Sequence, residues 1–95
     1  MTLPSRQVGD CFQTSAGYCI RILSFEGDLT LIELAAVAQP LSISMFTADV
    51  FFQKPIPKSL FYDKETVLLL ENGGDLFPTT AELVSHYGPK CDTGR

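Results

Sequence analysis

The chain has 95 residues, of which 45% are hydrophobic and 19% charged, and its formal net charge is −4. A chain of this length forms one domain. The seven lysines and arginines are scattered and form no basic stripe, which argues against a surface that follows nucleic-acid phosphates. The eleven acidic residues are also dispersed. Because charged residues are scarce, we expect apolar area to stay exposed and to be covered by a second copy in a homo-oligomer.

The N-terminal residues and the cysteines indicate the compartment. Residues 1–6 lack the apolar core of a signal peptide, and no window approaches the roughly 18 consecutive apolar residues of a membrane span. Three cysteines are an odd number, which without an export signal favours free thiols in a reducing environment. We therefore expect a cytoplasmic protein that does not enter a membrane.

The first part of the chain predicts β-structure. Residues 1–7 are expected to form a flexible lead, and Val8–Thr14 a first strand. Gly17–Phe25 and Leu29–Leu34 flank the link Glu26-Gly27-Asp28, and two β-rich runs around a short glycine-containing link predict a β-hairpin.

The end of the second strand of this hairpin fits two alternative conformations. It continues into Ala35–Ala38 and stops at Gln39-Pro40, and Glu33–Ala38 fits either a strand or a helical turn, because alanine and leucine favour helices. The β-rich residues that follow the tight turn favour the strand.

A fourth strand is predicted at Leu41–Phe46, where the alternation puts Leu41, Ile43 and Met45 on one face. Thr47–Gln53 then fits a short helical turn with Thr47 as its cap. Pro55 and Pro57 predict an extended connector over residues 54–59.

Residues 60–88 predict a strand and then a helix. An apolar run resumes at Leu60–Tyr62, and the nearly continuous apolar residues of Thr66–Glu71 predict a buried strand. Asn72-Gly73-Gly74-Asp75 has the composition of a turn and lacks the continuation of a dinucleotide-binding or P-loop motif, so no cofactor is expected.

The last predicted element is a helix with marked ends. Thr79 and Glu82 match a capping box, and Leu83, Val84 and Tyr87 give an apolar stripe. Gly88 is suited to end the helix before Pro89, and residues 89–95 are expected to form a loose tail.

Together these elements predict an α+β fold: a small antiparallel sheet or SH3-like barrel of about five strands, with a short helical turn and one C-terminal helix. Residues 8–53 resemble a small SH3-like barrel in three features. Gly9-Asp10-Cys11-Phe12 opens a strand, a long hairpin follows, and Ser42-Ile43-Ser44-Met45 leads into a turn with Phe51. This resemblance covers about half of the chain at the level of the fold only.

A named family with such a barrel is the plasmid-borne type II dihydrofolate reductases, which assemble as tetramers around a shared pore. That family carries Val-Gln-Ile-Tyr in its pore strand, whereas the corresponding place here holds Ser42-Ile43-Ser44-Met45. The resemblance therefore implies no reductase activity, and no site residue is carried over. In general appearance the chain also resembles short accessory proteins of bacterial mobile elements.

Few side chains suggest chemistry. His86, near the end of the predicted helix, has no nucleophile motif beside it and favours a structural position over a general base. Cys11, Cys19, His86 and Cys91 have the composition of a zinc site, but no C-x₂₋₄-C pair is present, so we expect no metal. Glu33 interrupts an apolar strand, where it lies either on the solvent face or as a buried acid with a raised pKa.

Aromatic residues flank the proline connector: Phe51-Phe52 on one side and Phe61-Tyr62 on the other. They fit core packing, or an exposed ledge for a protein partner. We therefore predict a non-enzymatic interaction or regulatory module with no catalytic residue. The alternative is a small-molecule binder or minimal enzyme whose site forms at a subunit interface, where Glu33, Tyr62 or His86 converge.

Overall fold

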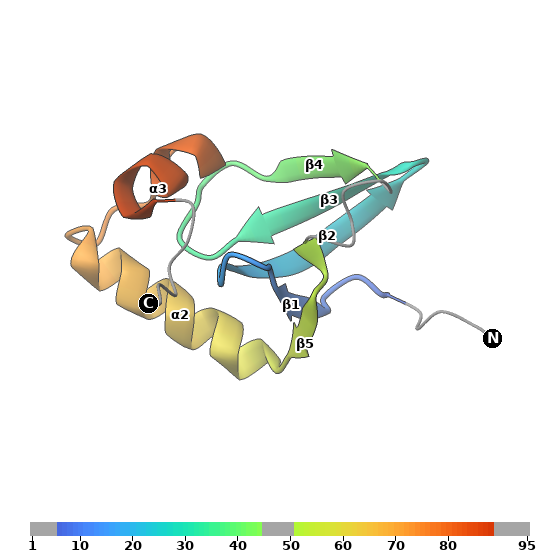
Figure 1. The fold of residues 1–95 in the computed structure, drawn as a ribbon, viewed down its shortest axis with the longest axis horizontal. Coiled ribbons are helices and arrows are strands. Elements are labelled where there is room, and N and C mark those ends of the chain that lie inside the picture. The colour runs from blue at the N-terminus through green and yellow to red at the C-terminus, as the bar shows by residue number, and fades with distance from the viewer. Residues whose placement is uncertain (1–5, 45–50, 89–95) are drawn as a thin grey trace.

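A computed structural model of the chain describes residues 6–44 and 51–88. It shows an α+β fold in which a five-stranded antiparallel sheet carries two helices (Figure 1). The strands lie in the order β4-β3-β2-β1-β5. The elements are β1 (Cys11–Gln13), β2 (Cys19–Glu26), β3 (Leu29–Leu34), β4 (Leu41–Ser44), β5 (Lys54–Ile56), α2 (Lys58–Glu71) and α3 (Thr80–Tyr87).

The predicted hairpin is confirmed as β2 and β3. Glu26 pairs with Leu29, so the loop consists of Gly27 and Asp28 and is one residue shorter than predicted. Gly27 has a φ of +62°, which side-chain-bearing residues rarely adopt. A β-bulge between Ile22 and Ser24 inserts one extra residue into β2.

The strand predicted to run on to Ala38 ends at Leu34. Ala35 and Ala36 form a tight turn, in which the Val37 N–H donates to the Leu34 carbonyl at 3.1 Å. Val37 then makes a parallel bridge with Phe77, which ties this turn to the segment before α3.

The two faces of the sheet differ in character. One face carries the buried core side chains Phe12, Ile20, Ile22, Ile32, Leu34 and Ile43. On the other face α2 packs against β1 and β2 (Figure 1). Phe61 is fully buried and Leu68 nearly so, and both belong to α2.

The buried strand predicted at Thr66–Glu71 is wrong, because this segment is the second half of α2. No glycine or proline interrupts the chain between Pro57 and Gly73, and the leucines of the run are good helix formers. The buried residues Phe61 and Leu68 are seven positions apart, or two helical turns. A continuous apolar run of this length does not distinguish a strand from a buried helix.

The extended connector predicted over residues 54–59 is confirmed only as far as Pro57, and its first part is a paired strand. Lys54–Ile56 forms β5, an edge strand that pairs with β1 and sets Pro55 opposite Phe12. An edge strand accommodates proline because one side of its backbone needs no partner. Lys58 and Ser59 already belong to α2.

The C-terminal helix is confirmed as α3. The Thr79 side chain caps it by accepting a hydrogen bond from the Glu82 N–H at 3.2 Å, and Leu83 is fully buried. Gly88 ends the helix with a φ of +89°. The prediction of a single C-terminal helix is nevertheless incomplete, because the structure also contains α2, which is longer than α3.

The remaining strand predictions hold in part. β1 is shorter than predicted, β4 is described over Leu41–Ser44, and Ile43 is buried as the alternation of β4 required. Met45 and most of the helical turn predicted at Thr47–Gln53 lie outside the described residues. Among the described strands no pairing joins β4 to β5, so an antiparallel sheet is shown and its closure into a barrel stays a prediction. No described helix has the length and apolar character that crossing a membrane requires.

Candidate functional site

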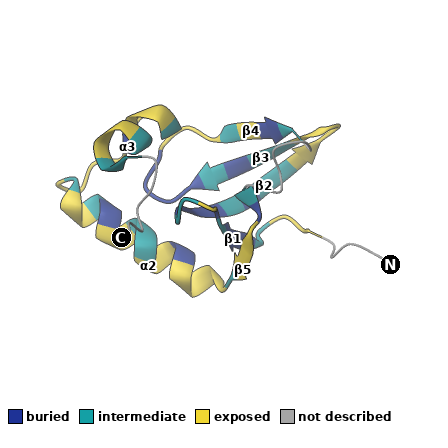
Figure 2. Ribbon diagram, in the orientation of Figure 1, coloured by how far each residue is buried: buried dark blue, intermediate teal, exposed yellow. Residues whose placement is uncertain are grey.

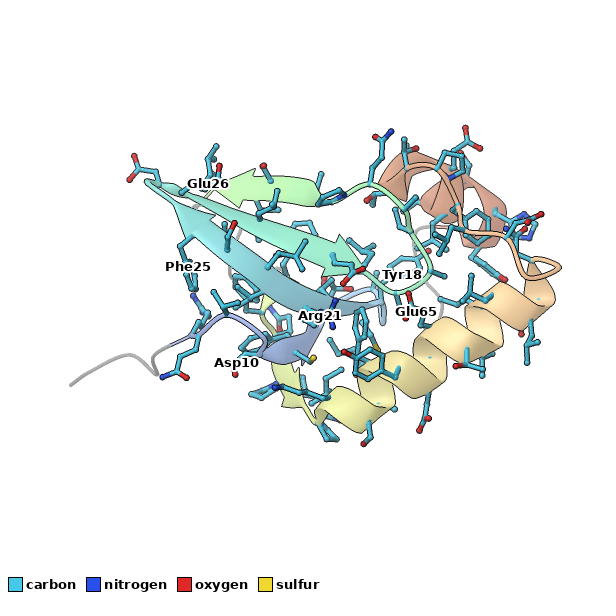
Figure 3. The ribbon with its side chains drawn as sticks, turned by 180° about the vertical axis from the view of Figure 1, so that it is seen from behind. Asp10, Tyr18, Arg21, Phe25, Glu26 and Glu65 are labelled. Carbon is cyan, nitrogen blue, oxygen red and sulfur yellow. The ribbon has the colours of Figure 1, made fainter. Side chains whose placement is uncertain are left out.

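Arg21 occupies the centre of the sheet face that α2 covers. It lies on β2, opposite Cys11 on β1 and Glu33 on β3. Residues directly opposite each other in antiparallel strands project from the same face, so these three side chains share the side of the sheet that faces α2. Figure 3 shows Arg21 between the sheet and α2, with Glu65 farther along the helix.

The Arg21 guanidinium joins the sheet to the helix. One terminal nitrogen forms an ion pair with Glu33, and the other donates a hydrogen bond to the Tyr62 hydroxyl. The guanidinium carbon lies 5.3 Å from the ring centre of Phe61 and 5.6 Å from that of Tyr62, within the range of cation–π attraction. Burial lowers the pKa of Arg21, but attraction to Glu33 and the hydrogen bond outweigh burial, so its pKa is raised.

Two predicted ligand-site residues therefore meet, and a third does not join them. Glu33 and Tyr62 both bind Arg21. His86 is exposed on α3, with its ring 5.4 Å from that of Phe77 and 4.7 Å from that of Tyr87. Arg21 is the residue that sequence reasoning missed, because an arginine within a strand carries no motif of its own.

A hollow of about 190 Å³ opens beside Arg21. It lies between β2, the first turns of α2 and the chain just before β1. Its lining residues are Val8, Gly9, Arg21, Ile22, Leu23, Lys58 and Tyr62. The hollow thus combines two cationic side chains and a phenol with apolar walls.

Both described cysteines, Cys11 and Cys19, are buried. Burial raises the pKa of Cys11, while Arg21 and Lys58 lower it by less. The thiol therefore stays protonated at neutral pH, which does not suit a nucleophile. In the described ranges no three metal-ligating side chains gather, and Cys91 lies outside those ranges.

Most of the predicted aromatic ledge belongs to the interior. Phe52 and Phe61 are buried, and Phe51 is half-buried. Phe52 meets Phe12 edge to face, with ring centres 4.9 Å apart. The two buried rings match the core-packing interpretation, and Tyr62 is the exposed member of the group.

The outer side of α2 carries apolar side chains that no described element covers. Leu60, Val67 and Leu70 are 40%, 47% and 73% exposed. Their spacing of seven and three residues places them along one stripe of the helix, which we call the α2 stripe. Figure 2 shows α2 exposed along much of its length, with buried positions where it meets the sheet. This helix therefore has apolar residues on two sides.

None of the protein families, curated proteins and solved structures compared with this chain matches it.

Proposed function

We propose that the protein is a non-enzymatic protein-interaction module that associates with a second copy of itself through the α2 stripe. The observation that carries this proposal is the exposure of Leu60, Val67 and Leu70 on a helix whose other side already packs on the sheet. A helix on the surface of a monomer normally turns a polar face to water, and contiguous exposed apolar residues mark interaction sites.

The charges beside the stripe favour a second copy as the partner. Asp63 and Lys64 lie between Leu60 and Val67. In a two-fold antiparallel arrangement centred between Asp63 and Lys64, Leu60 of each copy faces Val67 of the other. Asp63 of each copy then faces Lys64 of the other, so that each apolar contact and each charge pair occurs twice. Such an isologous contact needs only the surface that this chain already presents.

A matched pair of leucine variants tests this function. Leu60 in the stripe and Leu29 at the start of β3 are similarly exposed, at 40% and 43%. Sedimentation velocity should show that Leu60→Glu dissociates the complex, because it places a charge in an apolar contact, and that Leu29→Glu leaves the complex intact. Equal sedimentation of Leu60→Glu and the unmodified protein would contradict the proposal.

The SH3-like barrel and the cytoplasmic setting belong to the same proposal. The continuous buried face of the sheet, with Phe52 packed on Phe12, supports a strongly curved sheet that has α2 on its outside. Closure would protect from hydrogen exchange those β4 amides that do not pair with β3, and their rapid exchange would argue for an open sheet. The buried thiols of Cys11 and Cys19 support a reducing compartment.

A further inference from the structure

We propose that the hollow between β2 and the first turns of α2 binds a small monocarboxylate that carries a short apolar group. The cationic side of the hollow is formed by Arg21 and Lys58, and its apolar walls by Val8 and Leu23. Its volume of about 190 Å³ suits a ligand of a few carbon atoms. This site is separate from the α2 stripe and goes beyond the proposed self-association.

Positive charge is concentrated at this hollow although the chain as a whole is acidic. The structure describes five cationic side chains, Arg6, Arg21, Lys54, Lys58 and Lys64, and two of them line this one hollow, which no acidic side chain lines. Arg21 and Lys58 both act to lower the pKa of the neighbouring Cys11 thiol, and each does so more strongly than Asp10 or Glu33 raises it, so positive charge prevails among the charged groups around this place. A concave site with converging cations favours an anionic ligand.

The charge balance favours a monoanion over inorganic phosphate. Glu33 neutralises Arg21 through the ion pair. Lys58 forms no hydrogen bond or ion pair with any residue that the structure describes, so within the described ranges the Lys58 charge is the one that a ligand can balance. A carboxylate balances that charge, whereas a phosphate dianion would leave an excess of negative charge beside Glu33.

The remaining groups suit the two ends of such a ligand. The Tyr62 hydroxyl accepts a hydrogen bond from Arg21, which leaves its own proton to donate to a carboxylate oxygen. At Gly9 a Cβ atom would lie 3.5 Å from the Lys58 ammonium and would take up space at the cation. Val8 and Leu23 offer apolar surface to the other end of the ligand.

Titration of the ¹⁵N-labelled full chain with isovalerate tests the site. We expect saturable amide shifts at Gly9, Lys58 and Tyr62. Isovaleramide, which has the same shape without the charge, should bind at least about tenfold more weakly, the usual effect of losing a charge-assisted contact. Inorganic phosphate should also bind more weakly, because it brings excess negative charge beside Glu33 and has no apolar group. The proposal is overturned if isovalerate causes no saturable shift, or if the amide or phosphate binds as tightly.

Two lysine variants provide the control. Lys58→Gln should weaken isovalerate binding by about tenfold or more, while Lys54→Gln, which removes the same charge from the exposed strand β5, should leave it unchanged. An equal loss in both variants would show attraction to overall charge and would overturn the site. Unchanged amide shifts elsewhere would confirm that Lys58→Gln is folded.

The same carboxylate chemistry has two sources, a free organic acid and the C-terminus of a peptide. N-acetylvaline presents the second source, with an apolar side chain next to a terminal carboxylate. Tighter binding of N-acetylvaline than of isovalerate would assign the site to chain termini, and the reverse order would assign it to free acids. Both results support a carboxylate site, provided that the two ligands compete. Binding of N-acetylvaline without displacement of isovalerate would overturn a shared site.

Discussion

Arg21 links three elements through a single side chain. It pairs with Glu33 across the hairpin, donates to Tyr62 on α2 and lies near the Phe61 ring. About a quarter of each charged side chain in the pair is exposed, so the pair is only partly shielded from water. Removing one member would leave the other charge half-buried without its partner. The resulting loss in the free energy of unfolding is larger than the net stabilisation that the intact pair provides.

Replacing Arg21 should therefore destabilise the fold, and replacing its partner as well should restore part of the loss. We expect Arg21→Met to lower the free energy of unfolding by about 1–3 kcal/mol, measured by urea denaturation. The double variant Arg21→Met/Glu33→Met should be more stable than the single variant. A double variant that is no more stable would contradict the role assigned to Glu33.

The buried thiol of Cys11 predicts a loss of stability in alkali. Its pKa in the folded chain is raised above the ordinary value of 9.0, chiefly by burial. As the pH rises past 9.0, the unfolded chain ionises this thiol before the folded chain does, so unfolding becomes more favourable. The free energy of unfolding should thus decline above this pH, and less steeply in Cys11→Ala. Identical slopes in both proteins would contradict the assignment.

At the scale of elements, α2 supports the turn that follows β3. Ala36 is fully buried and has a φ of +69°, a conformation that costs about 1 kcal/mol for alanine. Its N–H donates to the Glu65 carboxylate at 3.4 Å, and its carbonyl accepts from the Phe77 N–H at 2.9 Å. The turn is therefore held by α2 on one side and by the segment before α3 on the other.

This support predicts a difference between two substitutions at Glu65. Glu65→Ala removes the acceptor and should lower the free energy of unfolding by about 1–2 kcal/mol, with faster hydrogen exchange at the Ala36 amide. Glu65→Gln keeps an acceptor oxygen and should lose less. Equal losses would show that the contact with Ala36 contributes little.

The α2 stripe gives a second prediction at this scale. Asp63→Lys should weaken self-association because it places two cations opposite each other in the antiparallel arrangement. Asp63→Lys/Lys64→Asp should restore association, since the exchanged charges again face each other. Concentration-dependent sedimentation measures both effects. If the double variant remains as weak as the single variant, the antiparallel arrangement is wrong.

The hairpin and α3 could be predicted because their signals are local. Gly27 marks the loop, and Thr79 with Gly88 marks the ends of the helix. The Arg21–Glu33 pair could not be predicted in the same way. Counting back from the Glu26–Leu29 pair without a bulge places Ile22 opposite Glu33, and the extra residue in β2 moves Arg21 into that position. No turn or composition signal marks this bulge.

The strand predicted at Thr66–Glu71 and the connector predicted at residues 54–59 differ from the structure for reasons of tertiary context. The apolar residues Val67–Leu70 fit a buried strand as well as a helix that is apolar on two sides. Pro55 excludes a central strand but not an edge strand beside β1. The core packing of Phe52 and Phe61 followed from their size, whereas the exposure of the α2 stripe depends on which face of α2 meets the sheet.

At the scale of the whole molecule, the low content of charged residues agrees with the exposure of apolar side chains on α2. Charged residues make up 19% of the chain, below the roughly 25% of a typical domain. The sheet buries its apolar face, but α2 keeps Leu60, Val67 and Leu70 in contact with water. Covering that stripe in a dimer would remove the largest run of exposed apolar side chains on one described element.

The most direct test of self-association is the mass of the unmodified protein in solution, measured by sedimentation equilibrium over a range of concentrations. The two-fold arrangement predicts a species of twice the 10.4 kDa chain mass that dissociates on dilution. A mass of 10.4 kDa at every concentration would contradict self-association through α2.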